Sequence, residues 1–195
     1  QQWQQAGILS RELALYQTLH NDYSVQVSIV SYGNAADVSI ADGFPGIKVH
    51  CNRWRLPARF YQRFVHLIHA PHIARTDLIK TNQFYGSNIA LRAAKVWRKK
   101  LIVRGGYLWS RFMAQQYGDT SAQAQHAQQI EQQVFSGADA VVVTALHMVD
   151  HIKTSYHLST RLGIIPNYVD TDLFQSHATP KRYDLCYVGR LAPQK

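Results

Sequence analysis

Short β-branched segments alternate with segments of helical periodicity along most of the chain, and this alternation limits its possible folds more than any other feature. Strands are predicted at 25–30, 47–51, 77–81, 101–103, 140–144 and 162–165. Apolar residues at helical spacing predict helices over 9–19, 57–69, 89–97, 127–137 and 148–156. Alternating strands and helices are typical of βαβ units, whose strands pair in parallel. We therefore expect an α/β fold with a mostly parallel sheet and helices on both of its faces.

The composition agrees with a buried core and excludes several classes of protein. The chain has 195 residues, of which 46% are hydrophobic, so intrinsic disorder and fibrous structure are excluded. No apolar run approaches the roughly 18 residues that span a bilayer, and the first residues lack the features of a signal peptide. Cys51 and Cys186 have no Cys or His partner at metal-ligand spacing, which is typical of a reducing compartment. We expect a soluble cytoplasmic protein without structural zinc or a disulfide framework.

The character of the sequence changes after Ile165. The next residues, PNYVDTDLFQSHATPKR, are typical of a linker, and YDLCYVG at 183–189 predicts a new strand. We therefore predict an amino-terminal domain over 1–175, followed over 176–195 by a linker and the first strand and loop of a second domain. No strand is predicted ahead of the first helix, so we expect the first strand of the sheet, like most of the second domain, to lie outside the sequence.

The segment YVGRLAPQK combines a glycine and two cations at the carboxyl end of the strand predicted at 183–189. Gly189 permits close approach of the backbone to a ligand, and Arg190 and Lys195 follow it. Ligands of open α/β sheets bind at the carboxyl ends of the strands. A guanidinium can bind two phosphate oxygens and an ammonium adds a point charge, so this pair suits a diphosphate. A solvated turn is the alternative interpretation of the same residues.

A second motif, IIPNYVDTDLF at 164–174, lies one linker upstream of the first. With both motifs in this order, the sequence resembles the GT-B retaining glycosyltransferases of the family 4 type. The residues that match the family pattern are Ile165, Pro166, Asn167, Val169, Asp170 and Phe174 in one motif and Gly189, Arg190, Leu191 and Lys195 in the other. Tyr168 stands where the family usually has glycine. The segment 137–152 also resembles the last strand and helix of the family's amino-terminal domain.

The resemblance implies a Rossmann-like domain of a two-domain enzyme that moves a sugar from a nucleotide-diphosphate donor to an acceptor hydroxyl, with retention. It implies that Arg190 and Lys195 are catalytic, since they match positions that neutralise the departing diphosphate. The same two residues bind the donor, together with Gly189. Gly7, ahead of the first helix, lets donor phosphate or acceptor approach the helix amino terminus, whereas a flexible lead-in is the alternative. This chemistry requires no metal, so we expect no cofactor besides the nucleotide sugar itself.

The resemblance also assigns the interdomain hinge to Pro166, Asn167 and Asp170. The family's paired glutamates, which hold the donor sugar and ribose, lie further along the second domain than residue 195. We therefore expect the 195-residue chain alone to be inactive, and the complete protein to be a hexosyltransferase.

Two loops at the predicted carboxyl edge of the sheet carry groups that suit a sugar acceptor. The loop after the strand at 101–103 supplies a cation, two glycines and an aromatic ring: Arg104, Gly105, Gly106 and Tyr107. The loop after the strand at 77–81 supplies Asn82, whose amide can form hydrogen bonds with hydroxyl groups. The alternative is a pair of ordinary loops anchored by buried aromatic residues.

The helix predicted at 57–69 has a basic face with Arg59 and Arg63 and an apolar face with Phe60 and Phe64. Basic residues beside exposed aromatics can rest on an anionic membrane, whereas a core-packed helix with a solvated basic face is the alternative. The membrane interpretation favours a lipid-linked or glycan acceptor in the synthesis of cell-envelope polysaccharide or glycolipid. It places the protein peripherally on the inner face of the cell membrane.

A basic α/β module that binds nucleic acid without catalysis is the competing hypothesis. It rests on the formal charge of +9 and on the Arg and aromatic residues of 53–63. Single-strand binders need aromatic residues along a continuous basic groove, whereas the basic residues here are scattered. We therefore do not expect a nucleic-acid partner.

Overall fold

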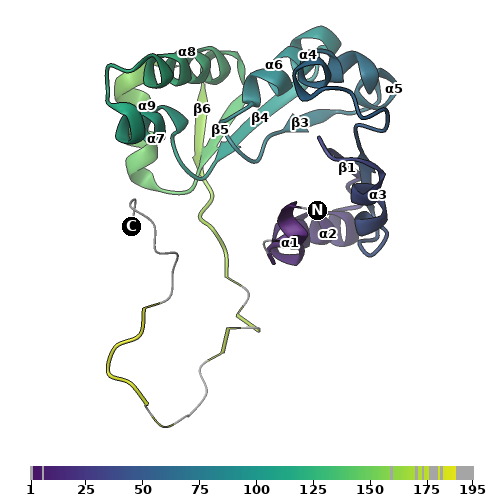
Figure 1. The fold of residues 1–195 in the computed structure, drawn as a ribbon, viewed down its shortest axis with the longest axis horizontal. Helices are drawn as coiled ribbons and strands as arrows, with labels where there is room; N and C mark the ends of the chain where they lie inside the picture. The colour runs from purple at the N-terminus through teal and green to yellow at the C-terminus, as the bar shows by residue number, and fades with distance from the viewer. Residues whose placement is uncertain are drawn as a thin grey trace.

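The computed structural model describes residues 2–5, 7–158, 160–169, 171–172, 174–175, 180 and 182–187. Figure 1 shows their arrangement as a ribbon. In chain order the described elements are α1 (Gln2–Gln5), α2 (Leu9–Tyr23), β1 (Val27–Val30), α3 (Ala35–Ala41), β2 (Ile47–His50), α4 (Ala58–Ile68), α5 (Ala70–Ala74), β3 (Leu78–Lys80), α6 (Ser87–Trp97), β4 (Lys100–Gly105), α7 (Trp109–Tyr117), α8 (Ala122–Gly137), β5 (Ala140–Val143), α9 (Leu146–Tyr156) and β6 (Arg161–Ile164).

The strands pair in parallel, and helices connect them, which confirms the predicted α/β class. They form a two-stranded sheet of β1 and β2 and a four-stranded sheet in the order β3-β4-β5-β6. The sequence predicted one sheet, but β1 and β3 do not pair with each other in the described part of the chain. The strand expected ahead of α2 stays a prediction.

The helices distribute between the two sheets. Figure 1 shows α4, α6, α8 and α9 along one side of the four-stranded sheet, with α1, α2 and α3 grouped around β1. A crossover between neighbouring parallel strands must return over a face of the sheet, and this requirement places a helix after each strand. The carboxyl ends of β3, β4, β5 and β6 therefore lie along a common edge.

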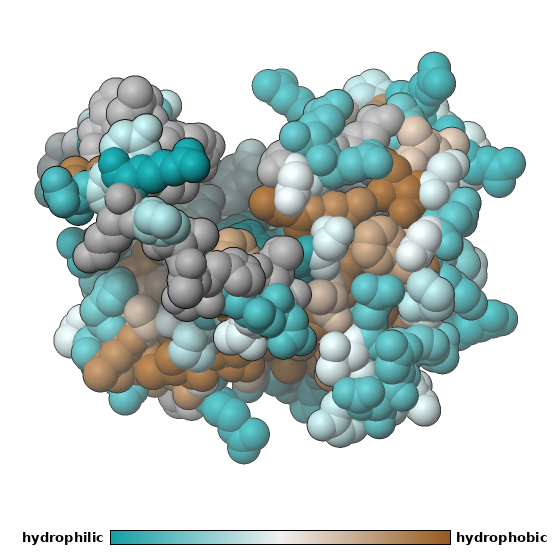
Figure 2. All heavy atoms as spheres, turned by 90° about the horizontal axis from the view of Figure 1, so that it is seen from below, coloured by the Kyte–Doolittle hydropathy of each residue, from teal (hydrophilic) through white to brown (hydrophobic). Residues whose placement is uncertain are grey.

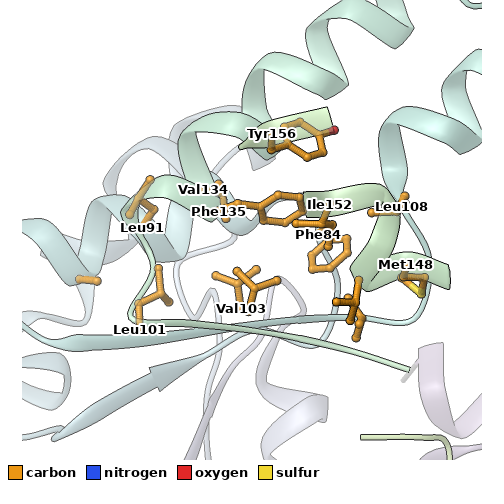
Figure 3. Packing of buried hydrophobic residues seen from close by; sticks show 14 residues of the cluster. Phe84, Leu91, Leu101, Val103, Leu108, Val134, Phe135, Met148, Ile152 and Tyr156 are labelled. Atoms are coloured by element: carbon orange, nitrogen blue, oxygen red, sulfur yellow. The ribbon is translucent and has the colours of Figure 1, made fainter. Parts of the chain in front are cut away.

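The hydrophobic core lies between the four-stranded sheet and α6, α8 and α9 (Figure 3). Val103 of β4, Val141 of β5, Phe135 of α8 and Ile152 of α9 are fully buried. Phe84 packs edge-on against Phe135, with the ring centroids 4.9 Å apart. Each such side chain stabilises the fold by roughly 1.5–3 kcal/mol on burial. The core thus fixes the four-stranded sheet against one helical layer.

Local capping contacts explain where several helices begin. The Asn34 side chain accepts a hydrogen bond from the Ala36 amide at the start of α3, and Ser121 accepts one from the Ala124 amide at the start of α8. The sequence predicted α8 from its apolar spacing, whereas α1, α3, α5 and α7 were not predicted. Short helices bury few residues and therefore show little periodicity.

One sequence expectation needs correction. The acceptor loop was predicted to begin at Arg104, but Arg104 and Gly105 are the last residues of β4, and α7 begins at Trp109. The strand predicted at 183–189 stays a prediction. The described residues 182–187 form no strand, and residues 188 and 189 lie outside the described residues.

Two further observations concern the membrane and the thiols. In the part of the chain that the structure describes, no helix has the length and apolarity needed to cross a bilayer. Cys51 is buried and Cys186 is exposed, and both are free thiols.

Candidate functional site

Two neighbouring strands carry a cation near their carboxyl ends. Lys80 is the last residue of β3, and Arg104 is the penultimate residue of β4. Lys80 pairs in register with Ile102, two residues before Arg104, so both cations project from the same face of the sheet. Leu101 and Val103 alternate with them and point into the core on the other face. The two positive charges therefore share one face at one edge.

Tyr16 of α2 and Asn82 surround the Lys80 ammonium. Lys80 Nζ donates to the Tyr16 hydroxyl at 2.8 Å and to Asn82 Oδ1 at 2.7 Å, and it lies 5.2 Å from the centre of the Tyr16 ring. The Tyr16 hydroxyl donates in turn to Asn82 Oδ1 at 2.8 Å. The oxygen of Asn82, predicted to bind acceptor hydroxyls, is thus already used by two donors of the chain.

Desolvation, followed by the nearby Arg104 charge, lowers the pKa of Lys80 to about 8, although Glu12 acts in the opposite direction. Desolvation also raises the pKa of Tyr16. Part of the Lys80 side chain still reaches water. The ammonium is therefore charged at pH 7 but lies in surroundings that disfavour an uncompensated positive charge.

Arg104 connects the sheet to the segment that follows β6. Its Nη2 donates to Asn167 Oδ1 at 3.1 Å. The backbone of Arg104 is held by Thr81, whose hydroxyl accepts from the Arg104 amide at 3.1 Å and lies 3.3 Å from the Arg104 carbonyl oxygen, to which it donates. Tyr168 donates its hydroxyl to the Arg11 carbonyl in the first turn of α2.

These contacts bring residues from four parts of the chain to the carboxyl edge of β3 and β4. We call them the carboxyl-edge cluster, and it consists of Tyr16, Lys80, Asn82, Arg104 and Asn167. Asn82 and Arg104 were predicted to bind the acceptor and Asn167 to form the hinge. The structure thus joins these separately predicted positions in one cluster.

The sequence reasoning missed Tyr16 and Lys80. Lys80 could have been found from its place at the end of the short apolar segment DLIK. Arg104 stands at the equivalent place in LIVRG. Parallel strands covered on both faces are usually apolar throughout, whereas β3 exposes Leu78 and Lys80 on the face opposite the core. No local signal identifies Tyr16, because its contact with Lys80 spans 64 residues.

The glycines of the predicted acceptor loop differ in their surroundings. A Cβ atom on Gly105 would lie 2.7 Å from the Phe84 ring, so packing requires glycine there. A Cβ atom on Gly106 would meet nothing within 4 Å. Gly106 and Tyr107 are exposed, and the Thr144 hydroxyl donates to the Gly106 carbonyl at 3.4 Å. An acceptor role for this loop stays a prediction.

Glu131 of α8, which was not predicted, holds the end of that loop. It is 1% exposed, and its Oε1 accepts from the amides of Trp109 and Ser110 at 2.7 and 3.2 Å. The Tyr156 hydroxyl donates to Oε2 at 2.5 Å. Desolvation, and then the neighbouring carboxylate, raise the pKa of Tyr156. A carboxylate at a helix amino terminus compensates unpaired amides and the helix dipole, which explains why α7 begins at Trp109.

The remaining predicted site residues lie elsewhere. Gly7 is exposed between α1 and α2, with φ of +67° and its amide donating to the Gln4 carbonyl. Pro166 is exposed after β6. Asp170, Gly189, Arg190 and Lys195 are outside the described residues. The hinge role of Asp170 and the donor-binding and catalytic roles of the others stay predictions.

A hollow lies apart from the carboxyl-edge cluster, and metal-ligating side chains do not gather within the described ranges. A hollow of about 600 Å³ between α7, α8 and α9 is lined by residues that include Arg111, Asp119 and His151. It does not include the carboxyl-edge cluster. Within the described ranges, no group of three or more His, Cys, Asp or Glu side chains is arranged to hold a metal ion.

Comparisons with known proteins give distant structural similarity. No protein-family model matches the chain, and no curated protein matches it at a significant level. The structure of UGT73P12 from Glycyrrhiza uralensis, complexed with glycyrrhetinic acid 3-O-monoglucuronide, matches 71% of this chain and 42% of its own, with 13% identity and a TM-score of 0.46. UGT89C1 from Arabidopsis thaliana, complexed with UDP-L-rhamnose, matches 82% of this chain and 49% of its own, with 13% identity and a TM-score of 0.47. The chain spans less than half the length of each structure, and similarity at this level assigns it no activity.

Proposed function

We propose that the chain is the acceptor-side domain of a GT-B retaining glycosyltransferase of the family 4 type. The enzyme transfers a sugar from a nucleotide-diphosphate donor to an acceptor hydroxyl. The observation that carries the proposal is the meeting of Asn82, Arg104 and Asn167 at one carboxyl edge of a parallel sheet. This is the edge at which α/β sheets bind their ligands. It also connects the predicted acceptor loops to the segment that leads into the second domain.

The donor side of the proposal rests on the sequence motifs. Gly189 and Gly7 allow the donor phosphates to approach the backbone, while Arg190 and Lys195 neutralise the charge that grows on the departing diphosphate. Preorganised charges aimed at a developing charge are usually a large contribution to catalysis. Because these two cations perform that role, the transfer proceeds without a metal ion.

The acceptor side of the proposal includes a membrane. Tyr61 and Val65 bury one face of α4 in the protein. The other face exposes basic and apolar residues, namely Arg59, Phe60, Arg63 and Leu67. Phe60 and Leu67 are 50% and 53% exposed, which supports contact with anionic lipid rather than with the protein core. We propose a lipid-linked or glycan acceptor used in cell-envelope polysaccharide or glycolipid synthesis at the inner membrane face.

Transfer by the complete two-domain protein tests the proposed function. A panel of nucleotide sugars is supplied with membrane extract as acceptor, and incorporation of labelled sugar is measured. We expect Arg190→Ala and Lys195→Ala each to lower kcat by on the order of 10²-fold with little change in acceptor KM. Lys153→Ala, which removes an exposed cation from α9, is the matched control. Equal turnover in both variants and the control contradicts the donor-phosphate assignment.

A further inference from the structure

We propose that Lys80 and Arg104 bind a phosphate monoester on the acceptor. That the ligand is the sugar acceptor rests on the proposed function, whereas the phosphate site is defined by the described residues alone. The two cations project from one face of adjacent parallel strands and are connected to Tyr16, Asn82 and Asn167. The ligand is identified here by its charge and by its hydrogen-bonding groups.

The two cations of the carboxyl-edge cluster form their hydrogen bonds with neutral oxygens. Lys80 donates to the hydroxyl of Tyr16 and to amide and carbonyl oxygens of Asn82 and Thr81, all of which are neutral. Arg104 donates to the neutral Asn167 oxygen. The ion pairs found among the described residues, Arg11–Glu12 and Lys100–Asp139, include neither cation. Two neighbouring cations without a bonded carboxylate repel each other and are stabilised by a bound anion.

Glu12 of α2 is an acidic group whose charge acts on Lys80, and it raises the pKa of Lys80. Glu12 is itself bonded to Arg11, with Oε1 2.8 Å from the guanidinium. Its charge is therefore shared with another cation. Desolvation and the Arg104 charge together lower the pKa of Lys80 to about 8, although Lys80 is exposed, so its surroundings favour a compensating negative charge.

The Lys80 ammonium and the Arg104 guanidinium match a phosphate monoester in charge and in hydrogen bonding. A guanidinium binds two oxygens of a phosphate in its planar fork, and an ammonium binds a third as a point charge. A phosphate monoester carries about −1.5 to −2 at pH 7, which balances the two cations of the cluster. A carboxylate carries one negative charge and leaves the second cation uncompensated. The site is thus matched to a dianion.

Arg104 lies next to the loop predicted to receive the acceptor. Arg104 directly precedes Gly105 and Gly106, and Gly106 is open to solvent beside Tyr107. A phosphate held by Arg104 therefore anchors a ligand next to the loop predicted to receive the acceptor. Asn167 bonds to the same guanidinium, so ligand binding at Arg104 also involves the segment that follows β6.

The test is isothermal titration of the 195-residue chain with inorganic phosphate and with glycerol 1-phosphate, and with acetate as the monoanion. We expect both phosphates to bind and acetate not to bind. Lys80→Gln and Arg104→Gln should each weaken phosphate binding at least about tenfold, since hydrogen bonds to charged groups are the strong ones. Lys153→Gln removes an equal charge from the exposed side of α9 and should leave the affinity unchanged.

Two further measurements separate a local site from general effects. Lys80→Arg should retain most of the phosphate affinity, whereas unfolding of Lys80→Gln would be visible as a change in circular dichroism. Affinity for glycerol 1-phosphate, whose second pKa is about 6, should fall between pH 7 and 9, because Lys80, with a pKa of about 8, loses its proton there. No phosphate binding by the wild-type chain, equal binding by acetate, or an equal loss in Lys153→Gln overturns the proposal.

The outcome is independent of the proposed function. If the complete protein transfers sugar but the chain does not bind phosphate, the phosphate site is wrong and the proposed function stands. If the chain binds phosphate through Lys80 and Arg104 but the complete protein transfers no sugar, the site is supported and the proposed function is wrong.

Discussion

Single residues at the carboxyl edge differ in what their neighbours demand of them. The charge of Arg104 lowers the pKa of the neighbouring Lys80, whereas Gly105, which follows Arg104, packs against the Phe84 ring. Glu131 is fully enclosed, yet each of its carboxylate oxygens accepts a hydrogen bond. A buried carboxylate with satisfied oxygens contributes order to the loop it holds, because removing it leaves the Trp109 and Ser110 amides unpaired.

The two adjacent glycines allow a matched prediction. Gly105→Ala places a Cβ atom 2.7 Å from the Phe84 ring, whereas Gly106→Ala meets no atom within 4 Å. Overpacking of a core typically costs about 1–3 kcal/mol. We expect urea denaturation to show that loss of unfolding free energy for Gly105→Ala, and a change within about 0.5 kcal/mol for Gly106→Ala. Equal stability of the two variants would show that Phe84 can move aside freely.

At the scale of elements, the contact between β2 and α5 is built from histidines. The His50 ring stacks on His72 with centroids 3.8 Å apart, and its centroid lies 5.8 Å from that of His69. His69 Nε2 lies 2.7 Å from the Tyr61 hydroxyl of α4. Three imidazoles pack together here, and Lys48 of β2 is a further nearby cation. Protonation of the His50 ring therefore weakens this contact.

This arrangement predicts a loss of stability in acid. Desolvation, followed by the charges of His72, His69 and Lys48, lowers the pKa of His50 to about 4. The unfolded-state pKa is near 6.5, so protonation favours the unfolded chain. The stabilising contribution is complete above about pH 6.5 and is lost as the pH falls from there through about 4. Thermal melts between pH 7.5 and 4 should show a steeper fall in Tm for the wild type than for His50→Gln.

His147→Gln provides the control for this pH dependence, since His147 is exposed near the start of α9. Its Tm should follow the wild-type curve. Parallel curves for the wild type and His50→Gln would mean that the histidine contact does not contribute to the acid sensitivity.

The second element with a testable role is α4. If its exposed face rests on anionic lipid, each arginine contributes roughly 1 kcal/mol near the surface, and the binding decreases with salt. We expect sedimentation with anionic vesicles to decrease at high salt and in the Arg59→Glu, Arg63→Glu double variant. The control is Arg111→Glu with Lys153→Glu, which changes the net charge equally on α7 and α9.

Neutral vesicles and an oligonucleotide complete that experiment. Neutral vesicles should bind little throughout. Wild-type protein that ignores anionic vesicles at low salt would contradict the membrane role of α4, and tight oligonucleotide binding with a steep salt dependence would favour the nucleic-acid hypothesis.

At the scale of the whole molecule, the described strands divide between two sheets. The β1–β2 sheet and the four-stranded sheet do not pair with each other in the described residues. Figure 2, viewed from below, shows brown apolar side chains among the teal polar ones on this side of the molecule. Val30 of β1 and Leu78 of β3 are 41% and 44% exposed, so both sheets leave apolar strand residues accessible.

The proposed function makes a prediction for the chain as a whole. On the proposed function, the active site lies between two domains, and its donor half is proposed to include paired glutamates further along the second domain. We expect the 195-residue chain to bind a nucleotide sugar weakly and to give no turnover, by titration and by transfer of labelled sugar. Measurable transfer by the chain alone would contradict the two-domain proposal.

The fold class and most elements could be predicted because their signals are local. Period-two and helical spacing depend only on residues a few positions apart, and the strands beginning at Val27, Ile47 and Ala140 were found within two residues. The division of the strands into two sheets, where one was expected, shows the limit of this signal. A strand is stable only beside another strand, and that neighbour is not specified locally.

The candidate site was predictable in part for the same reason. Arg104 and Asn82 could be placed near one edge, since the carboxyl ends of parallel strands share an edge, whereas Asn167 was predicted only as part of the hinge. The contact of Tyr16 with Lys80 could not be predicted, because it depends on how α2 packs against β3. The role of Glu131 also depends on packing, since among the glutamines of α8 it resembles an exposed residue until α7 and α9 enclose it.

The sequence alone thus determined that this chain forms parallel α/β units and where most of its strands and helices lie. Only the tertiary structure decided that the strands divide into two sheets and that Lys80 and Arg104 are neighbours. It also decided that Glu131 of α8 accepts the amides at the start of α7. The physical reason is range. Backbone conformation and hydrophobic periodicity act between residues close in sequence, whereas desolvation, charge repulsion and packing act between residues close in space.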